Sequence, residues 1–147
     1  MDIICYNVAR KNRTRIRVLR RAREGNEMRF AICSSDENEI ARISSLFREC
    51  TAGAHSGATA VTFRSEDAFF EVFRPGYFRG VVAGYGDVRG FLFARRVREE
   101  DSGCRVILLD DTERYAIRGL RIHLSDYLVR PLNEDRLREA LERMLTE

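Results

Sequence analysis

The chain has 147 residues, a length suited to one domain with a single hydrophobic core. Hydrophobic residues make up 44% and charged residues 33%, which is the composition of a soluble globular protein and not of a disordered, collagen-like or membrane-spanning one. No apolar run approaches the roughly 20 residues that cross a bilayer. The net charge of +3 is too small to indicate nucleic acid as a partner of the whole chain.

Charge is distributed unevenly along the chain. Residues 1–29 hold nine Lys and Arg against three acids, whereas residues 30–147 hold seventeen against twenty. We therefore expect residues 1–27 to be a basic, flexible arm and residues 28–147 to be the folded domain. The basic residues within 10–23 are the one place where the sequence allows contact with nucleic acid or an anionic membrane surface.

The four cysteines lie far apart, with neither a Cys-x-x-Cys pair nor a nearby histidine cluster. This spacing predicts free thiols in a reducing cytoplasm and indicates neither a metal site nor a disulfide framework. The first residues lack the pattern of a signal peptide, so we expect a cytoplasmic protein. We expect no metal and no cofactor.

The first half of the domain alternates strand-like and helix-like segments. Met28–Cys33 predicts a strand, and residues 36–50 carry apolar residues at helical spacing. Asp36 and Glu39 have the spacing of a capping box at the start of this helix. Residues 59–63 predict a second strand. Ser65 then predicts the N-cap of a helix that runs to Arg74, before Pro75 and Gly76.

The second half continues the alternation. We expect strands at residues 78–83, 105–109 and 126–129 and helices at residues 87–99, 112–121 and from Asn133 onward. The helical spacing predicts which apolar side chains face the core: Phe91, Leu92, Ala94 and Val97 in the first of these helices, and Leu137, Ala140, Leu141, Met144 and Leu145 in the last.

Five strands that are apolar on both faces, each followed by a helix, predict an α/β fold: a three-layer α/β/α sandwich around a five-stranded parallel sheet. In open sheets of this kind, ligands and chemistry lie at the carboxyl ends of the strands. The residues directly after the strands are therefore the candidate site: Ser34, Ser35, Asp36, Ala83, Gly84, Asp110, Asp111, Arg130 and Pro131.

At these strand ends the sequence resembles the receiver (CheY-like) domains of two-component response regulators, and most of all those that precede LytTR-type DNA-binding domains. The resemblance covers residues 28 to about 146 and rests on "MRFAICSSDENEI", "LLDDTERYAIRGL" and "DYLVRPLNEDRLREALERML". It implies a flavodoxin-like sheet with the order 2-1-3-4-5. It also implies a place in phosphorelay signal transduction.

The phosphorylation pocket of that family is degenerate here. The two acids that hold magnesium are replaced by Ser34 and Ser35, with an acid only at Asp36. The phosphoacceptor position falls on Ala83 or Gly84, and neither residue can form an acyl phosphate. Magnesium requires anionic oxygens in octahedral geometry, for which hydroxyls are poor substitutes.

The remaining pocket positions are changed as well. Asp110 stands where the family has Ser or Thr, and Arg130 replaces the lysine before Pro131, where the resemblance implies a cis peptide bond. We expect Asp110 to pair with Arg130, as a permanent imitation of the phosphorylated charge. Asp87 is expected to cap the following helix. The alternative is that Asp87 serves as a substitute phosphoacceptor.

These expectations describe a pseudo-receiver, which is a non-enzymatic protein-interaction module in signal transduction or transcriptional control that acts without phosphorylation. The resemblance implies an interaction face on the fourth helix, last strand and last helix of the domain, including Tyr115, Ile117, Leu120 and Tyr127. Its partner would be another protein or a second copy of the chain. The alternatives are a nucleic-acid-binding regulator that uses the basic arm and an atypical phosphoacceptor that uses Asp87.

Overall fold

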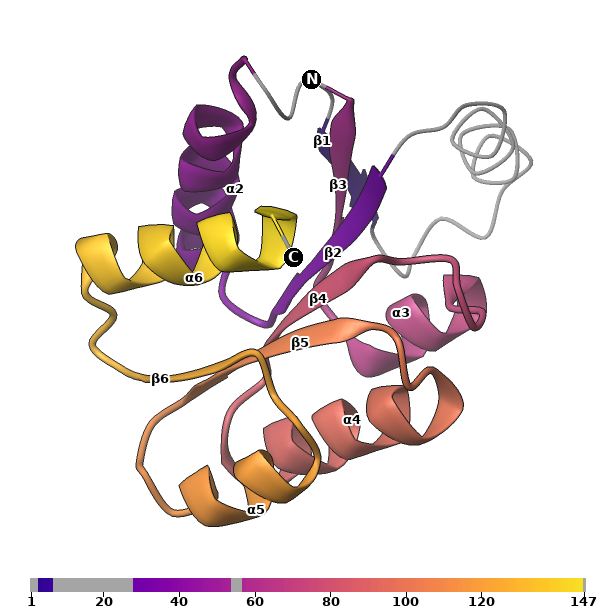
Figure 1. Cartoon of the computed structure of the whole chain (residues 1–147), viewed down its shortest axis with the longest axis vertical. Coiled ribbons are helices and arrows are strands. Elements are labelled where there is room, and N and C mark those ends of the chain that lie inside the picture. Colours follow the sequence, from indigo (N-terminus) through magenta and orange to yellow (C-terminus); the bar gives the residue numbers. More distant parts are fainter. Residues whose placement is uncertain (1–2, 7–27, 54–56, 147) are drawn as a thin grey trace.

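The computed structural model describes residues 3–6, 28–53 and 57–146. In this part of the chain one parallel sheet contains six strands, which Figure 1 shows: β1 (Ile3–Tyr6), β2 (Met28–Ser34), β3 (Ala58–Phe63), β4 (Gly80–Gly84), β5 (Arg105–Asp110) and β6 (Asp126–Val129). Their order is β1-β3-β2-β4-β5-β6. Strands β2 to β6 thus confirm the predicted five-stranded sheet and its order.

The described helices cover both faces of the sheet (Figure 1). On one face lie α2 (Glu37–Thr51) and α6 (Glu134–Thr146). On the other lie α3 (Glu66–Val72), α4 (Asp87–Glu100) and α5 (Ala116–Arg121). The three-layer α/β/α arrangement is therefore confirmed.

The core consists of two layers, one on each face of the sheet. Along β2, Phe30 and Ile32 pack with α2 and α6, whereas Ala31 and Cys33 pack with α3 and α4. This alternation explains why the central strands are apolar throughout, because successive side chains point to opposite faces and both faces are covered. The five side chains of α6 that the sequence predicts to face the core are all buried.

Three helices begin where the sequence predicts. The carboxylate of Asp36 accepts hydrogen bonds from the N–H groups of Asn38 and Glu39, Ser65 Oγ accepts from Ala68, and Asn133 Oδ1 accepts from Arg136. The other half of the predicted capping box is wrong. The N–H of Asp36 donates to Ser34 Oγ, and the side chain of Glu39 turns to the ends of the strands instead.

Helices α3 and α5 are shorter than predicted. Helix α3 ends at Val72 instead of Arg74, and α5 begins at Ala116 instead of Thr112. The late start of α5 has a visible cause. The hydroxyl of Tyr127 lies 2.6 Å from the carbonyl oxygen of Thr112 and shares its single proton between that oxygen and Asp110, and Thr112 Oγ1 accepts a hydrogen bond from the N–H of Arg114 at 3.3 Å. These contacts hold residues 112–115 as a turn.

The predicted inward face of α4 needs one correction. Leu92 is 43% exposed, whereas Phe91, Ala94 and Val97 are buried as predicted. Phe93 takes the inward position because its ring packs against Phe69, with 4.9 Å between ring centroids. An aromatic cluster between α3 and α4 therefore sets the rotation of α4.

Strand β1 was not predicted. It belongs to residues 1–27, which the sequence indicates as an arm, yet Ile3–Tyr6 pairs in parallel with the outer edge of β3, with Ile3 opposite Ala60 and Tyr6 opposite Phe63. Residues 7–27 lie outside the described residues, so nucleic-acid contact through residues 10–23 stays a prediction. Among the helices described, none is long and apolar enough to cross a membrane.

Candidate functional site

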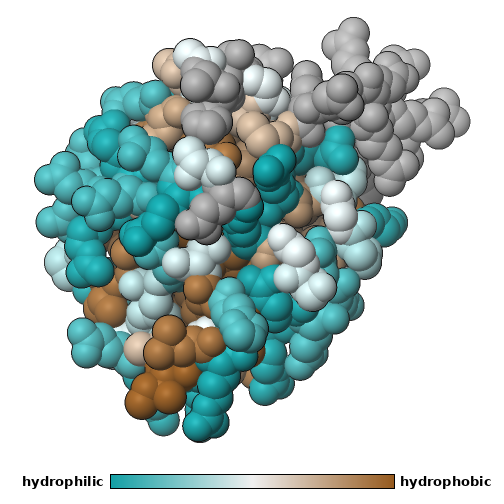
Figure 2. All heavy atoms as spheres, viewed as in Figure 1, coloured by the Kyte–Doolittle hydropathy of each residue, from teal (hydrophilic) through white to brown (hydrophobic). Residues whose placement is uncertain are grey.

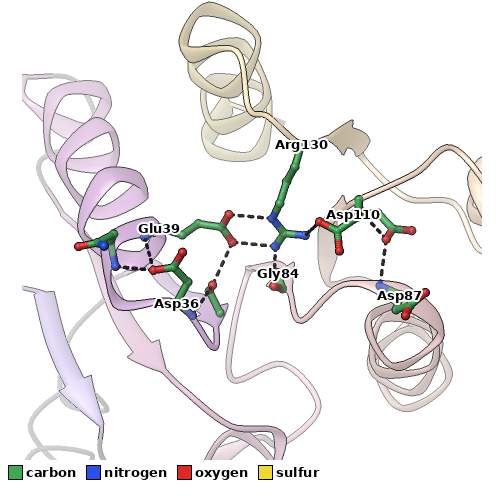
Figure 3. Close-up of polar contacts among 9 residues, drawn as sticks. Asp36, Glu39, Gly84, Asp87, Asp110 and Arg130 are labelled. Carbon is green, nitrogen blue, oxygen red and sulfur yellow. Dashed lines mark hydrogen bonds and ion pairs between the residues drawn. The ribbon is translucent and has the colours of Figure 1, made fainter.

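The carboxyl ends of β2, β4, β5 and β6 meet at one edge of the sheet, as predicted. Figure 3 shows Arg130 extending from the end of β6 across this edge to Glu39 on α2. The side chains of Arg130 and Glu39 are only 22% and 11% exposed. The candidate site is therefore centred on an ion pair that lies mostly beneath the surface.

The guanidinium of Arg130 binds Glu39 with two parallel hydrogen bonds. Nε donates to Oε2 and Nη2 donates to Oε1, each at 2.8 Å. Nη2 also donates to the carbonyl oxygen of Gly84 at 2.6 Å. A planar guanidinium suits such a fork, and paired charged hydrogen bonds are among the strongest in proteins. The hydrogen bonds to Glu39 raise the pKa of Arg130 above its ordinary value.

The predicted pair between the side chains of Asp110 and Arg130 is wrong. Only the backbone links these residues, because the N–H of Arg130 donates to the carbonyl of Asp110 at 2.7 Å. The Arg130 guanidinium reaches the neighbouring carboxylate instead, with 3.4 Å between Nη1 and Oδ1 of the exposed Asp111.

Asp110 is buried and accepts three hydrogen bonds. Oδ1 accepts from the N–H groups of Asp87 at 2.9 Å and Asp111 at 2.7 Å, and Oδ2 accepts from the hydroxyl of Tyr127 at 2.6 Å. Burial, followed by the hydrogen bond to Asp110, raises the pKa of Tyr127 above its ordinary value. The carboxylate thus ties the ends of β5 and β6 to the start of α4.

Asp87 does not cap α4 with its own side chain, so this prediction is also wrong. The N-cap is Gly86, and its φ of 71° places it in the left-handed region that glycine favours. Asp87 is the first helical residue, with φ of 58°, and its side chain is exposed. Asp110, the last residue of β5, therefore supplies the carboxylate that caps the start of α4.

The residues that follow β2 divide between two roles. Ser34 is buried, and its hydroxyl donates to Glu39 Oε1 at 2.9 Å, so it supports the ion pair. Ser35 is exposed and faces a separate cleft of about 310 Å³. Two arginines and two acids line this cleft, so its charges balance: it is bordered by Ser35, Arg64, Ser65, Glu66, Asp67, Tyr85 and Arg89.

The end of β4 has no room for a longer side chain. A Cβ atom on Gly84 would lie 2.7 Å from the carbonyl oxygen of Cys33 and 3.0 Å from Glu39 Oε1. Ala83 is fully buried in the core beneath α3 and α4, away from Arg130. A carboxylate introduced at position 84 would therefore require a shift of the backbone or of Glu39, and one introduced at position 83 would be buried in the core.

Two further sequence expectations concern the site. The peptide bond between Arg130 and Pro131 is cis, as the resemblance implied. Within the ranges 3–6, 28–53 and 57–146, no three His, Cys, Asp or Glu side chains are arranged to hold a metal ion.

Burial raises the pKa of the Cys104 thiol to about 12, so this thiol stays protonated at neutral pH.

The predicted interaction face is only partly exposed. Ile117 and Leu120 on α5 are 71% and 76% exposed, and Figure 2 shows an apolar patch where α5 lies. Tyr115 is buried and stacks on Phe91 with 5.1 Å between ring centroids, so its assignment to an exposed face is wrong. Tyr127 lies between these extremes, with its hydroxyl directed to Asp110.

A groove of about 440 Å³ lies beside the exposed pair of α5. It runs along β6 and is bordered by the end of the preceding loop and by the start of α6: its lining residues are Glu113, Ala116, Tyr127, Leu128, Val129, Pro131, Asn133 and Arg136. Tyr127 therefore borders this groove, and its hydroxyl bonds to Asp110 at the strand ends. One side chain connects the two regions.

Glu39 is the residue of the candidate site whose role the sequence did not reveal. Its spacing from Asp36 indicated a role in helix capping, and that role concealed its position beside the strand ends. The opposite charges of the two side chains could have indicated their pairing. Glu39 lies in the first turn of α2, directly after β2, and Arg130 lies at the end of β6, so both were predicted to be near the strand ends.

Comparison with known proteins supports the fold. No family model matches the chain, and no curated protein matches it. The non-phosphorylated HemR receiver domain from Leptospira biflexa superposes with a TM-score of 0.69 at 15% identity, over 82% of this chain and 96% of that domain. The BeF3-activated DrrB receiver domain gives 0.65 at 20% identity, over 82% of this chain and 99% of the other.

A longer structure of DrrB shows how much of a response regulator this chain matches. The Thermotoga maritima response regulator DrrB, an OmpR/PhoB homolog, gives a TM-score of 0.64 at 21% identity, and the match spans 81% of this chain but 52% of the regulator. The likeness includes both an activated and a non-phosphorylated domain, so it does not distinguish the two states. The chain has the fold of response-regulator receiver domains.

Proposed function

We propose that this chain is a pseudo-receiver: a non-enzymatic protein-interaction module of signal transduction or transcriptional control that works without phosphorylation. The ion pair between Arg130 and Glu39 carries the proposal. It occupies the strand-end edge where a receiver would bind a phosphoryl group and a metal ion, and it satisfies the charges of that edge internally.

The carboxylates near the site support the proposal. Glu39 is engaged by Arg130, and Asp110 already accepts three hydrogen bonds. Asp36 caps α2. Asp87 keeps an exposed carboxylate, but its backbone N–H is held by Asp110 and no cation lies against it in the described residues. Asp111 is exposed and lies 3.4 Å from Arg130. We expect none of these carboxylates to accept a phosphoryl group, because in the described part of the chain none belongs to a cluster of side chains that could hold a metal ion.

A permanent charge pair suits a module that stays in one state. Arg130 ties the end of β6 to α2 and to β4, and Asp110 ties β5 to β6 and to α4. Breaking a buried ion pair typically costs about 3 kcal/mol or more, so these ties oppose a second arrangement of the strand ends. We therefore expect that a phosphoryl group would change the arrangement of the strand ends little.

The exposed side chains of α5 give the module a surface for a partner. Burying a leucine or isoleucine side chain contributes about 1.5 to 3 kcal/mol, so covering Ile117 and Leu120 would favour association appreciably. The adjacent groove along β6 offers room for side chains of a partner. The partner that we propose for this surface is a second copy of the chain.

Sedimentation velocity over a range of protein concentrations tests this function. We expect self-association that Mg²⁺ and beryllofluoride leave unchanged, and that Ile117→Ser with Leu120→Ser weakens. The matched control is Val88→Ser with Leu92→Ser, because these side chains are 48% and 43% exposed on α4, outside the proposed face. Association that occurs only with beryllofluoride would contradict the proposal. A chain that stays monomeric in both conditions would exclude a second copy as its partner.

A further inference from the structure

The cleft that Ser35 faces lies where the chain reverses its direction across the sheet. From β2 the chain runs through α2 to β3 on one side, and from β3 it returns through α3 to β4 on the other side of β2. In open parallel sheets, the carboxyl ends of the strands beside such a reversal are the usual place for a ligand. The cleft, of about 310 Å³, lies at these ends because its lining residues follow β2, β3 and β4.

The charged groups of this cleft are not paired with one another. Arg64 bonds to Glu37, which lies outside the lining, at 2.7 Å. Among the ion pairs of the described residues, none includes Arg89, Glu66 or Asp67. The cleft therefore presents a cation from α4 and two acids from α3, and in the described part of the chain all three lack a charged partner.

The helix itself gives no reason for the position of Arg89. It is exposed and is the third residue of α4, and a cation near a helix N-terminus interacts unfavourably with the helix dipole. Glu66 and Asp67, in the first turn of α3, have the favourable sign. A charge that opposes its local environment is more typical of a functional position than of a structural one. Arg89 is therefore the lining residue that indicates a ligand most strongly.

The remaining lining residues are polar and uncharged. The ring of Tyr85 packs edge-on against Phe93, with 5.0 Å between ring centroids, and its hydroxyl donates to the carbonyl of Phe63 at 3.4 Å. Tyr85 is thus a fixed boundary of the cleft. Ser65 Oγ accepts an N–H of α3 and keeps its own proton for donation, and Ser35 has an exposed side chain.

We propose that this cleft binds a small zwitterion of the α-amino-acid class with a polar, uncharged side chain. The carboxylate of the ligand pairs with the guanidinium of Arg89, and its ammonium pairs with Glu66 or Asp67. The volume of the cleft lies at the lower end of the range for ligand pockets, which suits a molecule of this size.

Other classes of ligand fit these charges less well. The two acids repel an anion such as phosphate, and a simple amine leaves Arg89 without a partner. In the described residues no three side chains are arranged to hold a metal ion. A molecule that carries both charges satisfies both walls of the cleft.

This site is independent of the pseudo-receiver function. None of its lining residues bonds to Arg130, and none lies on α5. Loss of one proposal therefore leaves the other standing.

Titration of the full chain with L-glutamine and with L-serine, followed by amide NMR, tests the inference. We expect saturable shifts at Ser35, Glu66 and Arg89 and a dissociation constant of about 1 mM or tighter. Two analogues of L-glutamine isolate the charges, because N-acetyl-L-glutamine lacks the ammonium and L-glutaminamide lacks the carboxylate. Each should bind at least about tenfold more weakly than L-glutamine.

The variant Arg89→Gln identifies the carboxylate partner. We expect it to weaken L-glutamine binding about tenfold or more and to leave the affinity for L-glutaminamide unchanged. The matched control is Arg95→Gln, because Arg95 is an exposed arginine of the same helix that lies outside the cleft. It should bind L-glutamine as the unmodified chain does.

Three results would overturn the proposal. The first is the absence of saturable shifts with either amino acid up to about 10 mM. The second is binding of N-acetyl-L-glutamine as tight as that of L-glutamine, which would indicate a plain anion site. The third is an Arg89→Gln variant, folded by amide NMR, that keeps the affinity of the unmodified chain for L-glutamine.

Discussion

The side chains at the strand ends bond to one another, whereas the apolar side chains on the surface of α5 are left in contact with solvent. At the strand ends, Arg130, Glu39 and Asp110 are largely buried and every charge has a partner within the chain. On α5, Ile117 and Leu120 are mostly exposed and contribute little to the core. The fold is that of receiver domains; the charged side chains at its strand ends pair with one another, whereas Ile117 and Leu120 on α5 face solvent.

This difference indicates where the two regions act. Groups that are paired internally stabilise one arrangement of the chain, whereas exposed apolar groups gain free energy only when another molecule covers them. Substitutions at the strand ends should therefore change the free energy of unfolding, and substitutions on α5 should change association.

Glu39→Ala should have the largest effect, because it leaves the guanidinium of Arg130 mostly buried without its main partner. We expect a loss of about 3 kcal/mol in the free energy of unfolding, at the lower end for a buried ion pair because both side chains keep some solvent contact. Urea denaturation measures it. Glu39→Gln is the matched control and should cost less, since the amide still accepts a hydrogen bond.

A double-mutant cycle with Arg130→Met shows whether the two residues act as a pair. We expect the double variant to be more stable than the sum of the single effects predicts, by about 1 kcal/mol or more. Additive effects would mean that Arg130 and Glu39 contribute separately and that the closed site has another cause.

Asp110→Ala should come next. It removes the capping acceptor of α4 and the acceptor of the Tyr127 hydroxyl, and we expect a loss of about 2 kcal/mol. Urea denaturation again measures it, and the amide signals of Asp87 and Asp111 should shift in NMR spectra. Asp87→Asn is the control, because that side chain is exposed, and its effect should stay within about 0.5 kcal/mol. Equal losses in both variants would contradict the assigned cap.

Tyr127→Phe should have a smaller effect, about 1 kcal/mol, because Asp110 keeps its two backbone donors. It also predicts a pH dependence. The pKa of Tyr127 is raised in the folded chain, so above about pH 10 the unfolded chain loses this proton first and stability falls as the pH rises. The contribution is complete below about pH 10. Denaturation between pH 8 and 11 should show a shallower fall in Tyr127→Phe; identical slopes would contradict the raised pKa of the Tyr127 hydroxyl.

Ile117→Ser/Leu120→Ser should have the smallest effect on the free energy of unfolding, within about 0.5 kcal/mol, because both side chains already contact solvent. The same variant is the one expected to weaken association. A large loss of stability would show that these side chains belong to the core, and the contrast with the strand ends would then disappear.

Much of the fold could be predicted from the sequence. Local patterns determine it: apolar runs mark β2 to β6, and Asp36, Ser65 and Asn133 mark three helix starts. Strand β1 escaped prediction because four apolar residues before a polar stretch carry no distinctive pattern. Its pairing depends on a free edge that exists only once the sheet has formed.

The site was predicted in its location but not in its pairing. The missing carboxylate after β4 is visible in the sequence at Ala83 and Gly84. The partner of Arg130 is not, because Glu39 and Arg130 are 91 residues apart and Asp110, Asp111 and Glu39 all compete for one cation. Only the three-dimensional arrangement, in which Tyr127 and two backbone N–H groups engage Asp110, leaves Glu39 as the partner.

The most direct test of the closed site is a titration of the full chain with Mg²⁺ and beryllofluoride, followed by amide NMR. If the pair between Arg130 and Glu39 occupies the site, the signals of Gly84, Asp87 and Asp110 should stay within the shifts caused by the same ionic strength of NaCl. Saturable shifts that cluster at these strand ends would show a working phosphoryl site and contradict the account.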